Sequence, residues 1–342
     1  MSTGDELWAA QVTAGGALRF DEYLAVALYG EHGFYNTGGQ AGRRGDFITS
    51  PEVGPLFGAV LARWIEAEYR RLGEPDDFTI VEAGAGPGTL ARTILQAAPR
   101  WAGHYVAVEI SPVQRAKHPA GVTAQAEMPS APFRGVIIAN ELLDNLPFRL
   151  AVYDGGWREA VVQMAPDGTI SERLVAAPDT WTMLPAEAPH GARAPVQEAA
   201  AAWLAAAMAL VEGGTTGTGT VLMADYCTAR TTELALRPWR EWLRTYRSQA
   251  AGAHYLRNAG AQDVTTQVCL DQLPAPQTLR TQAQFLQLWG IDELVEDGRR
   301  AWAAAAGAPD LTALRMRSRV REAESLLQLN GLGGFLIGEW RS

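Results

Sequence analysis

Apolar positions along the chain follow two different spacings, and the change falls near residue 78. Upstream, apolar residues recur every three or four positions over 20–27 and again over 55–72, which predicts two helices. Downstream, helical stretches alternate with short apolar runs, which lie at 78–83, 105–110, 135–139 and 220–224. Strands that alternate with helices predict an α/β fold with a parallel sheet covered on both faces. We expect its ligand at the carboxyl ends of the strands.

A long segment between the third and fourth of these strands does not follow the alternation. Its first part, 150–164, predicts a β-hairpin that turns at Asp154-Gly155-Gly156. The next part, 165–195, is rich in proline and is predicted to be irregular, and 199–211 predicts a helix. Near the C-terminus, 334–340 is a candidate last strand.

These patterns divide the chain into three units. Residues 1–75 form an N-terminal helical segment that contains a loop rich in glycine and proline at 30–55. Loops of this length inside a compact chain are uncommon and often act as lids. The predicted core combines 76–147 with 216–342, and 148–215 is an inserted segment. We expect the insertion and both chain ends to build an additional helical and β substrate lobe.

Composition limits the partners. The 342 residues include 29 basic and 38 acidic side chains, a net charge of −9, which argues against a protein that binds nucleic acid through phosphate contacts. Four arginines are spaced by three and four positions and are predicted to share one helix face, either as a solvated surface or as a dock for an anionic partner. They are Arg237, Arg240, Arg244 and Arg247. The two cysteines and five histidines are scattered, so no metal site is expected.

No membrane or secretory segment is expected either. The longest apolar run, 199–211, is shorter than the roughly 20 residues that a membrane-spanning helix needs. The N-terminal residues are acidic and have no apolar stretch behind basic residues, as a signal peptide would. We therefore expect a cytoplasmic protein.

A glycine-rich turn follows the first core strand and opens a helix, in the sequence VEAGAGPGTL at 81–90. Glycines there allow a ligand to approach bare backbone. The spacing differs from the dinucleotide fingerprint, and Pro87 removes an amide that a pyrophosphate would use, which disfavours a dehydrogenase. The turn favours S-adenosylmethionine (SAM), although a generic tight turn is the alternative. The residues expected at the cofactor are Glu82, Gly84, Gly86 and Gly88.

Glu109 ends the second core strand. An acidic residue about 20 positions after such a turn accepts hydrogen bonds from ribose hydroxyls. The alternative is a solvated acid at a strand end.

The third core strand is followed by NELLDNLP, at 140–147. Its carboxylates, Glu141 and Asp144, could hold a cationic nitrogen, orient its lone pair or take its proton. The alternative is that these groups tie down a loop.

The lid candidate contains GDFITSPE, at 45–52. We expect Gly45, Asp46, Thr49, Ser50 and Pro51 to close over the site. Ser50 followed by Pro51 is also typical of a helix start, with Ser50 as the N-cap.

These blocks resemble the MidA-type family, which includes the mitochondrial complex I assembly arginine methyltransferase. The most specific matches are the blocks at 45–58 and 140–147, and weaker similarity runs nearly to the C-terminus. The sequence departs from the family pattern where two aromatics are usual and at two later positions. These departures are Leu142, Leu143, Cys227 and Gln267.

The resemblance implies a Rossmann-like class I SAM-dependent methyltransferase that modifies arginine on a protein, such as a respiratory complex I subunit, with a homodimer possible. Glu141 is then the first catalytic candidate, with Asp144 and Asp46 behind it. The implied cofactor residues are Glu82, Gly84, Gly86, Gly88, Glu109, Asn140, Gly45, Thr49, Ser50 and Pro51. The alternatives are a small-molecule or peptide O- or N-methyltransferase and a SAM-binding assembly factor without turnover.

Overall fold

The fold is that of a computed structural model. It describes residues 16–37, 49–165, 169–212, 218–247, 250–308 and 310–342.

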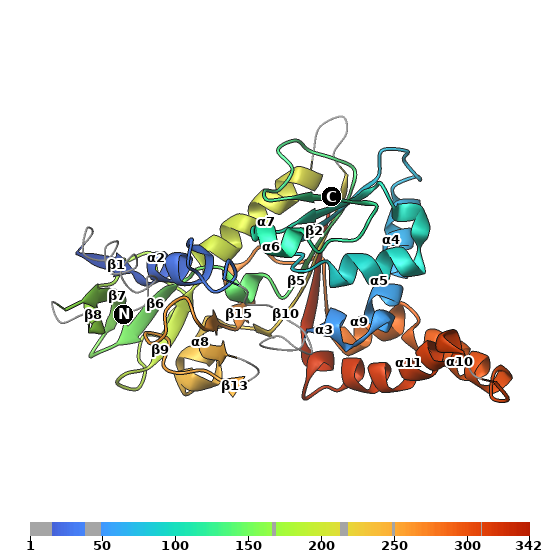
Figure 1. Cartoon of the computed structure of the whole chain (residues 1–342). Helices are drawn as coiled ribbons and strands as arrows, with labels where there is room; N and C mark the ends of the chain where they lie inside the picture. The colour runs from blue at the N-terminus through green and yellow to red at the C-terminus, as the bar shows by residue number, and fades with distance from the viewer. Residues whose placement is uncertain (1–15, 38–48, 166–168, 213–217, 248–249, 309) are drawn as a thin grey trace.

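A seven-stranded sheet forms the centre of the molecule (Figure 1). Across the sheet, its strands are β16 (Thr278–Thr281), β17 (Leu336–Arg341), β10 (Gly219–Asp225), β5 (Gly135–Asn140), β2 (Thr79–Ala83), β3 (Tyr105–Val108) and β4 (Val122–Gln125). The five strands from β10 to β4 are parallel, and β17 is antiparallel to both of its neighbours. The predicted α/β core with a mostly parallel sheet is confirmed.

The strand order reverses between β2 and β5. The chain passes from β2 outward to β3 and β4, and then returns to β5 on the other side of β2. The connections that follow β2 and β5 therefore leave the sheet in opposite directions, and ligands of open α/β sheets bind in the crevice that results at the carboxyl ends of these strands.

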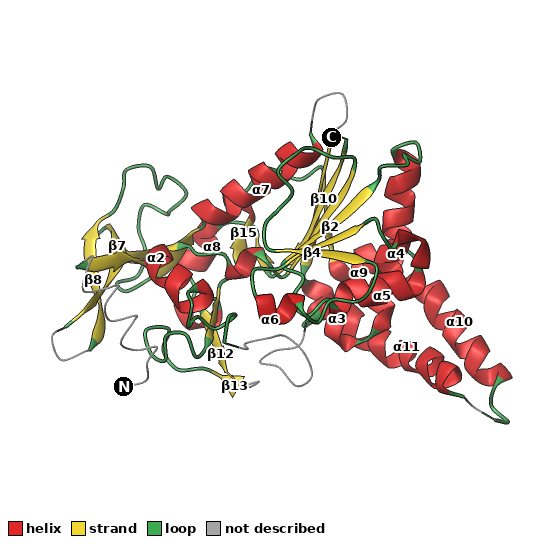
Figure 2. Ribbon diagram, turned by 45° about the horizontal axis from the view of Figure 1, so that its top comes forward, coloured by secondary structure: helices red, strands yellow, loops and turns green. Residues whose placement is uncertain are grey.

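Helices cover both faces of the sheet (Figure 2). On one face lie α4 (Pro55–Arg71), α5 (Thr89–Ala97) and α9 (Gln282–Leu288), and on the other lies α7 (Glu198–Val211). Along β5, Val136 packs with the helices α4, α5 and α9, and Ile137 packs with α7. Successive side chains of a strand point to opposite faces of the sheet. This double burial explains the uninterrupted apolar runs of the core strands.

A second, antiparallel sheet lies at one end of the molecule (Figure 1). Its strands are β1 (Ala17–Arg19), β7 (Trp157–Met164), β6 (Arg149–Tyr153) and β9 (Arg193–Val196), with β8 (Ile170–Ala176) paired to β7. The predicted hairpin at 150–164 is confirmed as β6 and β7. The irregular structure expected over 165–195 is wrong for β8, an edge strand with mostly half-buried residues and no clear alternation of polarity.

The N-terminal helical segment packs on this second sheet. The predicted helix at 20–27 is present as α2 (Phe20–Leu24), which continues as a π-helical stretch, η1 (Ala25–Tyr29). Phe20 and Leu24 are fully buried against Leu150 and Val162 of the hairpin. This contact places the end of η1 beside the central sheet.

The four arginines at 237–247 do not share a helix face, so that prediction is wrong. The segment is divided into α8 (Thr231–Ala235), a 3-10 turn η4 (Trp239–Glu241) and the strand β12 (Arg244–Arg247). Pro238 lies three positions after the last residue of α8, and proline disfavours helical backbone in the residue before it, Arg237. The strands β13 (Ala250–Ala251) and β14 (Asp263–Thr265) pair with β12 on either side.

A helix pair, α10 (Ile291–Ala304) and α11 (Leu311–Leu327), projects from the end of the molecule opposite the second sheet (Figure 1). The remaining short elements are α3 (Ser50–Val53), α6 (Pro112–Arg115), η2 (Pro99–Trp101), η3 (Leu143–Asn145), η5 (Leu270–Gln272), η6 (Leu332–Gly334), β11 (Cys227–Thr228) and β15 (Val268–Cys269). Within the described ranges, no helix has both the length and the apolar character to cross a membrane.

Candidate active site

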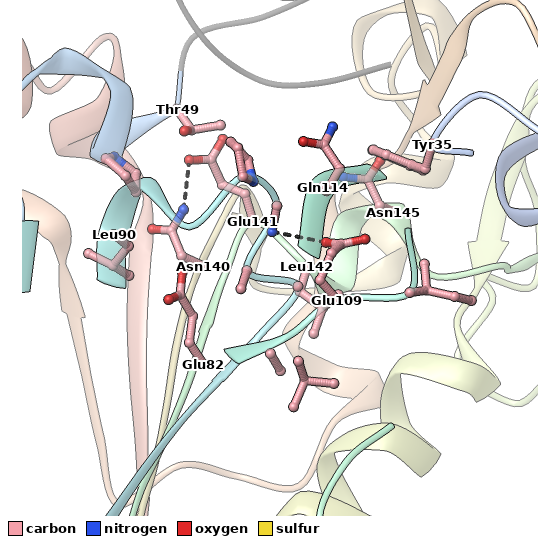
Figure 3. Close-up of a pocket in the computed structure, with 18 of the residues that line it drawn as sticks. Tyr35, Thr49, Glu82, Leu90, Glu109, Gln114, Asn140, Glu141, Leu142 and Asn145 are labelled. Carbon is pink, nitrogen blue, oxygen red and sulfur yellow. Dashed lines mark hydrogen bonds between the residues drawn. The ribbon is translucent and has the colours of Figure 1, made fainter. Parts of the chain in front are cut away.

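A cavity of about 460 Å³ opens at the carboxyl ends of β2, β3 and β5, where the strand order reverses (Figure 3). This volume lies within the range of small-molecule sites, about 300–1,000 Å³. Its walls include most of the residues that the sequence predicted for the cofactor and for catalysis. These are Glu82, Gly84, Gly86, Glu109, Asn140, Glu141, Thr49 and Pro51.

The glycine turn forms one wall. Gly84 and Gly86 have φ angles of +69° and +51°, which favour glycine because a side chain would strain the backbone. A Cβ atom on Gly84 would lie 3.0 Å from Cδ1 of Leu142, whereas one on Gly86 would meet no atom within 4 Å. Gly88 does not line the cavity; it caps α5 and lies against His118.

Glu109 presents a fixed carboxylate to the cavity. Its Oε2 accepts a hydrogen bond from the Gly86 N–H at 2.9 Å, and its Oε1 accepts one from the Ser111 N–H at 2.8 Å. The side chain is buried, so these two bonds set its orientation. Each carboxylate oxygen retains a lone pair that can accept a further hydrogen bond, as ribose hydroxyls require.

Glu82 lies deeper in the same wall. Its Oε2 accepts a hydrogen bond from the Tyr105 hydroxyl at 2.7 Å, and burial raises its pKa to about 8. A cation bound nearby would favour the charged carboxylate. Oδ1 of the neighbouring Asn140 is buried and has no hydrogen-bond partner among the described residues, so it is available to a ligand donor. The wall therefore fits a cofactor that carries hydroxyl donors and positive charge, as SAM does.

Glu141 has a left-handed backbone, with φ at +50°, directly after β5. Its Oε1 accepts hydrogen bonds from Nδ2 of Asn140 at 3.1 Å and from the Ser50 N–H at 3.3 Å. Burial and, as a smaller contribution, the charge of Asp225 raise the pKa of Glu141 to about 8. Strained backbone in a non-glycine residue is most common at functional sites. Glu141 can hold or accept a proton near neutral pH.

Asp144 lies outside the wall of the cavity, behind Asn145, whose Nδ2 donates to its Oδ1 at 3.1 Å. Asp225, at the end of β10, fixes this loop by accepting hydrogen bonds from the backbone N–H groups of Leu143 at 2.9 Å and Tyr226 at 2.8 Å. Burial and then the charge of Asp225 raise the pKa of Asp144 well above its usual range. The sequence left open that Glu141 and Asp144 hold this loop in place. In the structure, Asp225 holds the loop.

The SPE block begins a short helix, α3, whose N-cap is Thr49 rather than Ser50. Thr49 and Pro51 line the cavity, whereas the Ser50 hydroxyl points away and donates to Oε1 of Gln282 at 2.8 Å. Glu52 also lines the cavity and accepts a hydrogen bond from the Thr89 hydroxyl at 2.6 Å. The candidates Gly45 and Asp46 lie outside the described residues.

Several residues that line the cavity were not among the sequence candidates, and they include Tyr29, Tyr35 and Asn145. Tyr29 and Tyr35 lie in N-terminal stretches that resemble the family, and Asn145 lies within NELLDNLP, so the signal was present. Tyr29 and Tyr35 reach the cavity only through the packing of the N-terminal segment, which the sequence pattern does not reveal. In the parts of the chain that the structure describes, no group of His, Cys, Asp and Glu side chains is arranged to hold a metal ion.

The fold and the site define an α/β protein that binds a nucleoside-containing cofactor at a strand-order reversal. A family model described as "Putative S-adenosyl-L-methionine-dependent methyltransferase" matches residues 60–288, which is more than half of the chain. The protein belongs to this family of SAM-dependent methyltransferases. The expected enzyme class and cofactor are therefore confirmed.

Solved structures agree with this fold. A Burkholderia thailandensis protein crystallised with S-adenosyl-homocysteine superposes with a TM-score of 0.81 at 23% identity, over 99% of this chain and 92% of that chain. The native crystal structure of a protein from the same organism gives a TM-score of 0.80 at 22% identity, over the same shares of both chains. The Rossmann-like methyltransferase architecture is thus confirmed.

Curated relatives are similar over shorter segments. The Drosophila melanogaster protein arginine methyltransferase NDUFAF7 homolog, mitochondrial, is 29% identical over 46% of this chain and 44% of its own length. The mouse protein arginine methyltransferase NDUFAF7, mitochondrial, is 28% identical over 49% and 47%. The matched region thus spans less than half the length of these relatives. Their names place them in mitochondria, which contradicts the cytoplasmic location expected from the sequence.

Proposed function

We propose that this protein transfers the methyl group of SAM to a guanidinium nitrogen of arginine in a protein substrate. The observation that carries the proposal is Glu141, a strained and partly buried carboxylate in the cavity wall beside the glycine turn. The names of the curated relatives, which are protein arginine methyltransferases, support the same substrate. A subunit of respiratory complex I is the substrate that the family resemblance implies.

The chemistry assigned to Glu141 is binding and proton acceptance. When bound, SAM supplies a methyl group on a positively charged sulfur. A carboxylate next to a guanidinium binds it through charged hydrogen bonds and localises a nitrogen lone pair toward the methyl carbon. The nitrogen that receives the methyl group must lose a proton, and the Glu141 carboxylate would accept it, because the bound cations would favour the charged form of this group, whose pKa burial raises to about 8.

The cofactor is assigned to the part of the wall that the glycine turn and the carboxyl ends of the core strands form. Glu109 accepts hydrogen bonds from the ribose, while Glu82 and Asn140 face the methionine end. Gly84 and Gly86 allow the cofactor to approach the backbone. Thr49, Pro51 and Asn140 close the wall, and Ser50 and Gly88 act indirectly by holding α3 and α5. Asp144 acts from behind Asn145, because its Oδ1 accepts the hydrogen bond that orients the Asn145 amide.

The lobe formed by the second sheet and the N-terminal segment is proposed to bind the substrate, as the division at 148–215 implies. The lobe is separate from the sheet that carries the cofactor residues, and η1 brings its Tyr29 into the cavity wall (Figure 1). The homodimer implied by the resemblance stays a prediction, and light scattering of the purified chain tests it.

Labelled SAM tests the proposed function. The full chain is incubated with SAM that carries a deuterated methyl group and with a protein extract, and digested proteins are searched by mass spectrometry. The proposal expects deuterated methyl groups on arginine. Label found only on small molecules would favour the small-molecule alternative, and SAM binding without any labelled product would favour an assembly factor; either result would refute the arginine proposal.

A further inference from the structure

Tyr29, Tyr35 and Asn145 all line the cavity. Figure 3 shows Tyr35 and Asn145 on the side of Gln114 and Glu109. Tyr29 ends η1, and Tyr35 follows a tight turn in which its backbone N–H bonds to the carbonyl of Leu28 at 3.0 Å. The two rings are stacked, with centroids 5.5 Å apart and planes 15° from parallel. Two aromatic rings thus form a rigid wall that comes from outside the central sheet.

Both tyrosine hydroxyls are engaged in holding the wall. Tyr29 donates to the backbone carbonyl of Asn145 at 3.0 Å, and Tyr35 donates to Oδ1 of Asp263 at 3.1 Å. These bonds join the N-terminal segment to the loop after β5 and to β14. Each ring is therefore held by a hydrogen bond to a segment that is distant in the sequence.

Asn145 supplies an unused acceptor. Its side chain is 6% exposed, and its Nδ2 donates to Oδ1 of Asp144. Its Oδ1 is buried without a hydrogen-bond partner among the residues described. A buried acceptor without a donor is unfavourable, and a ligand N–H at this point would remove that cost.

Three acidic side chains lie in or against the loop that carries Asn145. Within the described ranges, no arginine, lysine or histidine forms an ion pair with Glu141, Asp144 or Asp225. Asp144 and Asp225 are buried, and Glu141 is partly buried. Buried carboxylates are stable as anions only when a cation or several donors compensate them. A positively charged ligand group would provide that compensation.

We propose that Tyr29, Tyr35 and Asn145 form the subsite for the methyl acceptor and select a flat, delocalised cation, the guanidinium group. The assignment rests on the proposed function, because it names where that substrate binds. A guanidinium stacks on aromatic rings and offers N–H donors in its own plane, so one donor can reach Oδ1 of Asn145 while the ring wall covers its face. A lysine ammonium is compact and strongly hydrated, so the same wall discriminates against it.

Ethylguanidinium tests the subsite because it reproduces the end of an arginine side chain. Its binding to the full chain loaded with S-adenosyl-homocysteine is measured by ligand-observed NMR, with ethylammonium as the comparison. We expect Tyr35→Leu and Asn145→Leu each to weaken ethylguanidinium binding by about tenfold or more, since each removes a cation–π or hydrogen-bond contact. Tyr35→Phe keeps the ring and is expected to bind nearly as the wild type does.

Controls separate a local effect from misfolding. Asn330→Leu makes the same change at an exposed turn and is expected to alter nothing. The affinity for S-adenosyl-homocysteine and the unfolding temperature show whether each variant is folded, and Asn145→Leu carries the test if Tyr35→Leu does not fold. Unchanged ethylguanidinium binding in a folded Asn145→Leu variant would refute the subsite.

Enzyme kinetics distinguish the subsite from the function on which it rests. If the wild type methylates an arginine peptide and the variants raise its KM with little change in kcat, both hold. If the wild type methylates the peptide and the KM values of the variants are unchanged, the subsite is wrong and the proposed function stands. If the wild type methylates no arginine, the proposed function is wrong, and the subsite as the arginine site falls with it.

Discussion

The backbone N–H of Ser50 donates to Oε1 of Glu141 at 3.3 Å, although 91 positions separate the two residues in the sequence. This bond joins the start of α3 to the carboxyl end of β5, so the segment before α4 and the central sheet share one wall of the cavity. It also sets the direction of the carboxylate that we propose as the proton acceptor.

Replacement of that carboxylate tests its role. Glu141→Gln keeps an acceptor for the N–H groups of Ser50 and Asn140 but cannot take a proton or pair with a guanidinium. We expect methyl transfer to fall by about a hundredfold or more, the usual effect of losing a general base, while SAM binding measured by calorimetry stays close to that of the wild type. Glu324→Gln, at an exposed position, is the matched control. Full activity in Glu141→Gln would contradict the assignment.

Glu109 is expected to bind the ribose, which SAM and S-adenosyl-homocysteine share. Glu109→Gln places an amide donor against the N–H group of either Gly86 or Ser111, which disrupts the bonds that orient the side chain. SAM and S-adenosyl-homocysteine should both bind about ten- to a hundredfold more weakly, since hydrogen bonds to a charged group are lost. Calorimetry with both ligands measures the effect, and Glu127→Gln is an exposed control. A loss confined to SAM would show that Glu109 senses the sulfonium and not the ribose.

Gly84 tests the need for bare backbone in the turn. Alanine at Gly84 or at Gly155, which lies in the hairpin turn between β6 and β7, pays a similar cost of about 1 kcal/mol for a positive φ. Only at Gly84 would the new Cβ atom lie 3.0 Å from Leu142, next to Glu141. Thermal unfolding and calorimetry should show that both variants are destabilised, and that Gly84→Ala alone loses SAM affinity. Equal SAM affinity in the two variants would argue against a cofactor at this turn.

The stability of the ligand-free protein should depend on the protonation of Glu82. Its pKa is about 8 in the folded state against an ordinary value of 4.5, because burial disfavours the charged form. Below pH 4.5 both the folded and the unfolded states keep the proton. Between 4.5 and 8 only the folded state keeps it, so the free energy of unfolding falls as the pH rises, by up to about 1.4 kcal/mol per pH unit.

Glu82→Gln removes this titration while keeping an acceptor for the Tyr105 hydroxyl. The unfolding temperature of the variant, measured by calorimetry from pH 5 to 8, should therefore fall less steeply than that of the wild type. Parallel curves would show that Glu82 is charged throughout this range.

Local sequence rules were sufficient to predict that the carboxylates of Glu82, Glu109 and Glu141 would lie in one cavity. Each of these residues ends or follows a parallel core strand, and the carboxyl ends of parallel strands meet at one edge of a sheet. Their meeting therefore follows from the order of strands and helices alone. The identity of the group that holds the loop did not follow, because Asp225 binds backbone N–H groups that only the folded loop presents to it.

The part of the cavity that we propose for the methyl acceptor depends on packing between distant segments of the chain. Tyr29 reaches Asn145 across 116 positions because the N-terminal helix is buried against the β6–β7 hairpin, which no local periodicity reveals. The arginine spacing around 237–247 indicated a helix that Pro238 interrupts, so backbone constraints overrode periodicity there. The edge strand β8 was missed because its residues are only half-buried and its polarity does not alternate.

The most direct test of the account measures both products of one reaction. The full chain, wild type or Glu141→Gln, is incubated with SAM and an arginine-rich peptide, and S-adenosyl-homocysteine and methylarginine are quantified together. The account predicts equal amounts of the two products from the wild type and a parallel loss of both in Glu141→Gln. Formation of S-adenosyl-homocysteine without methylarginine, or equal yields from the two proteins, would contradict it.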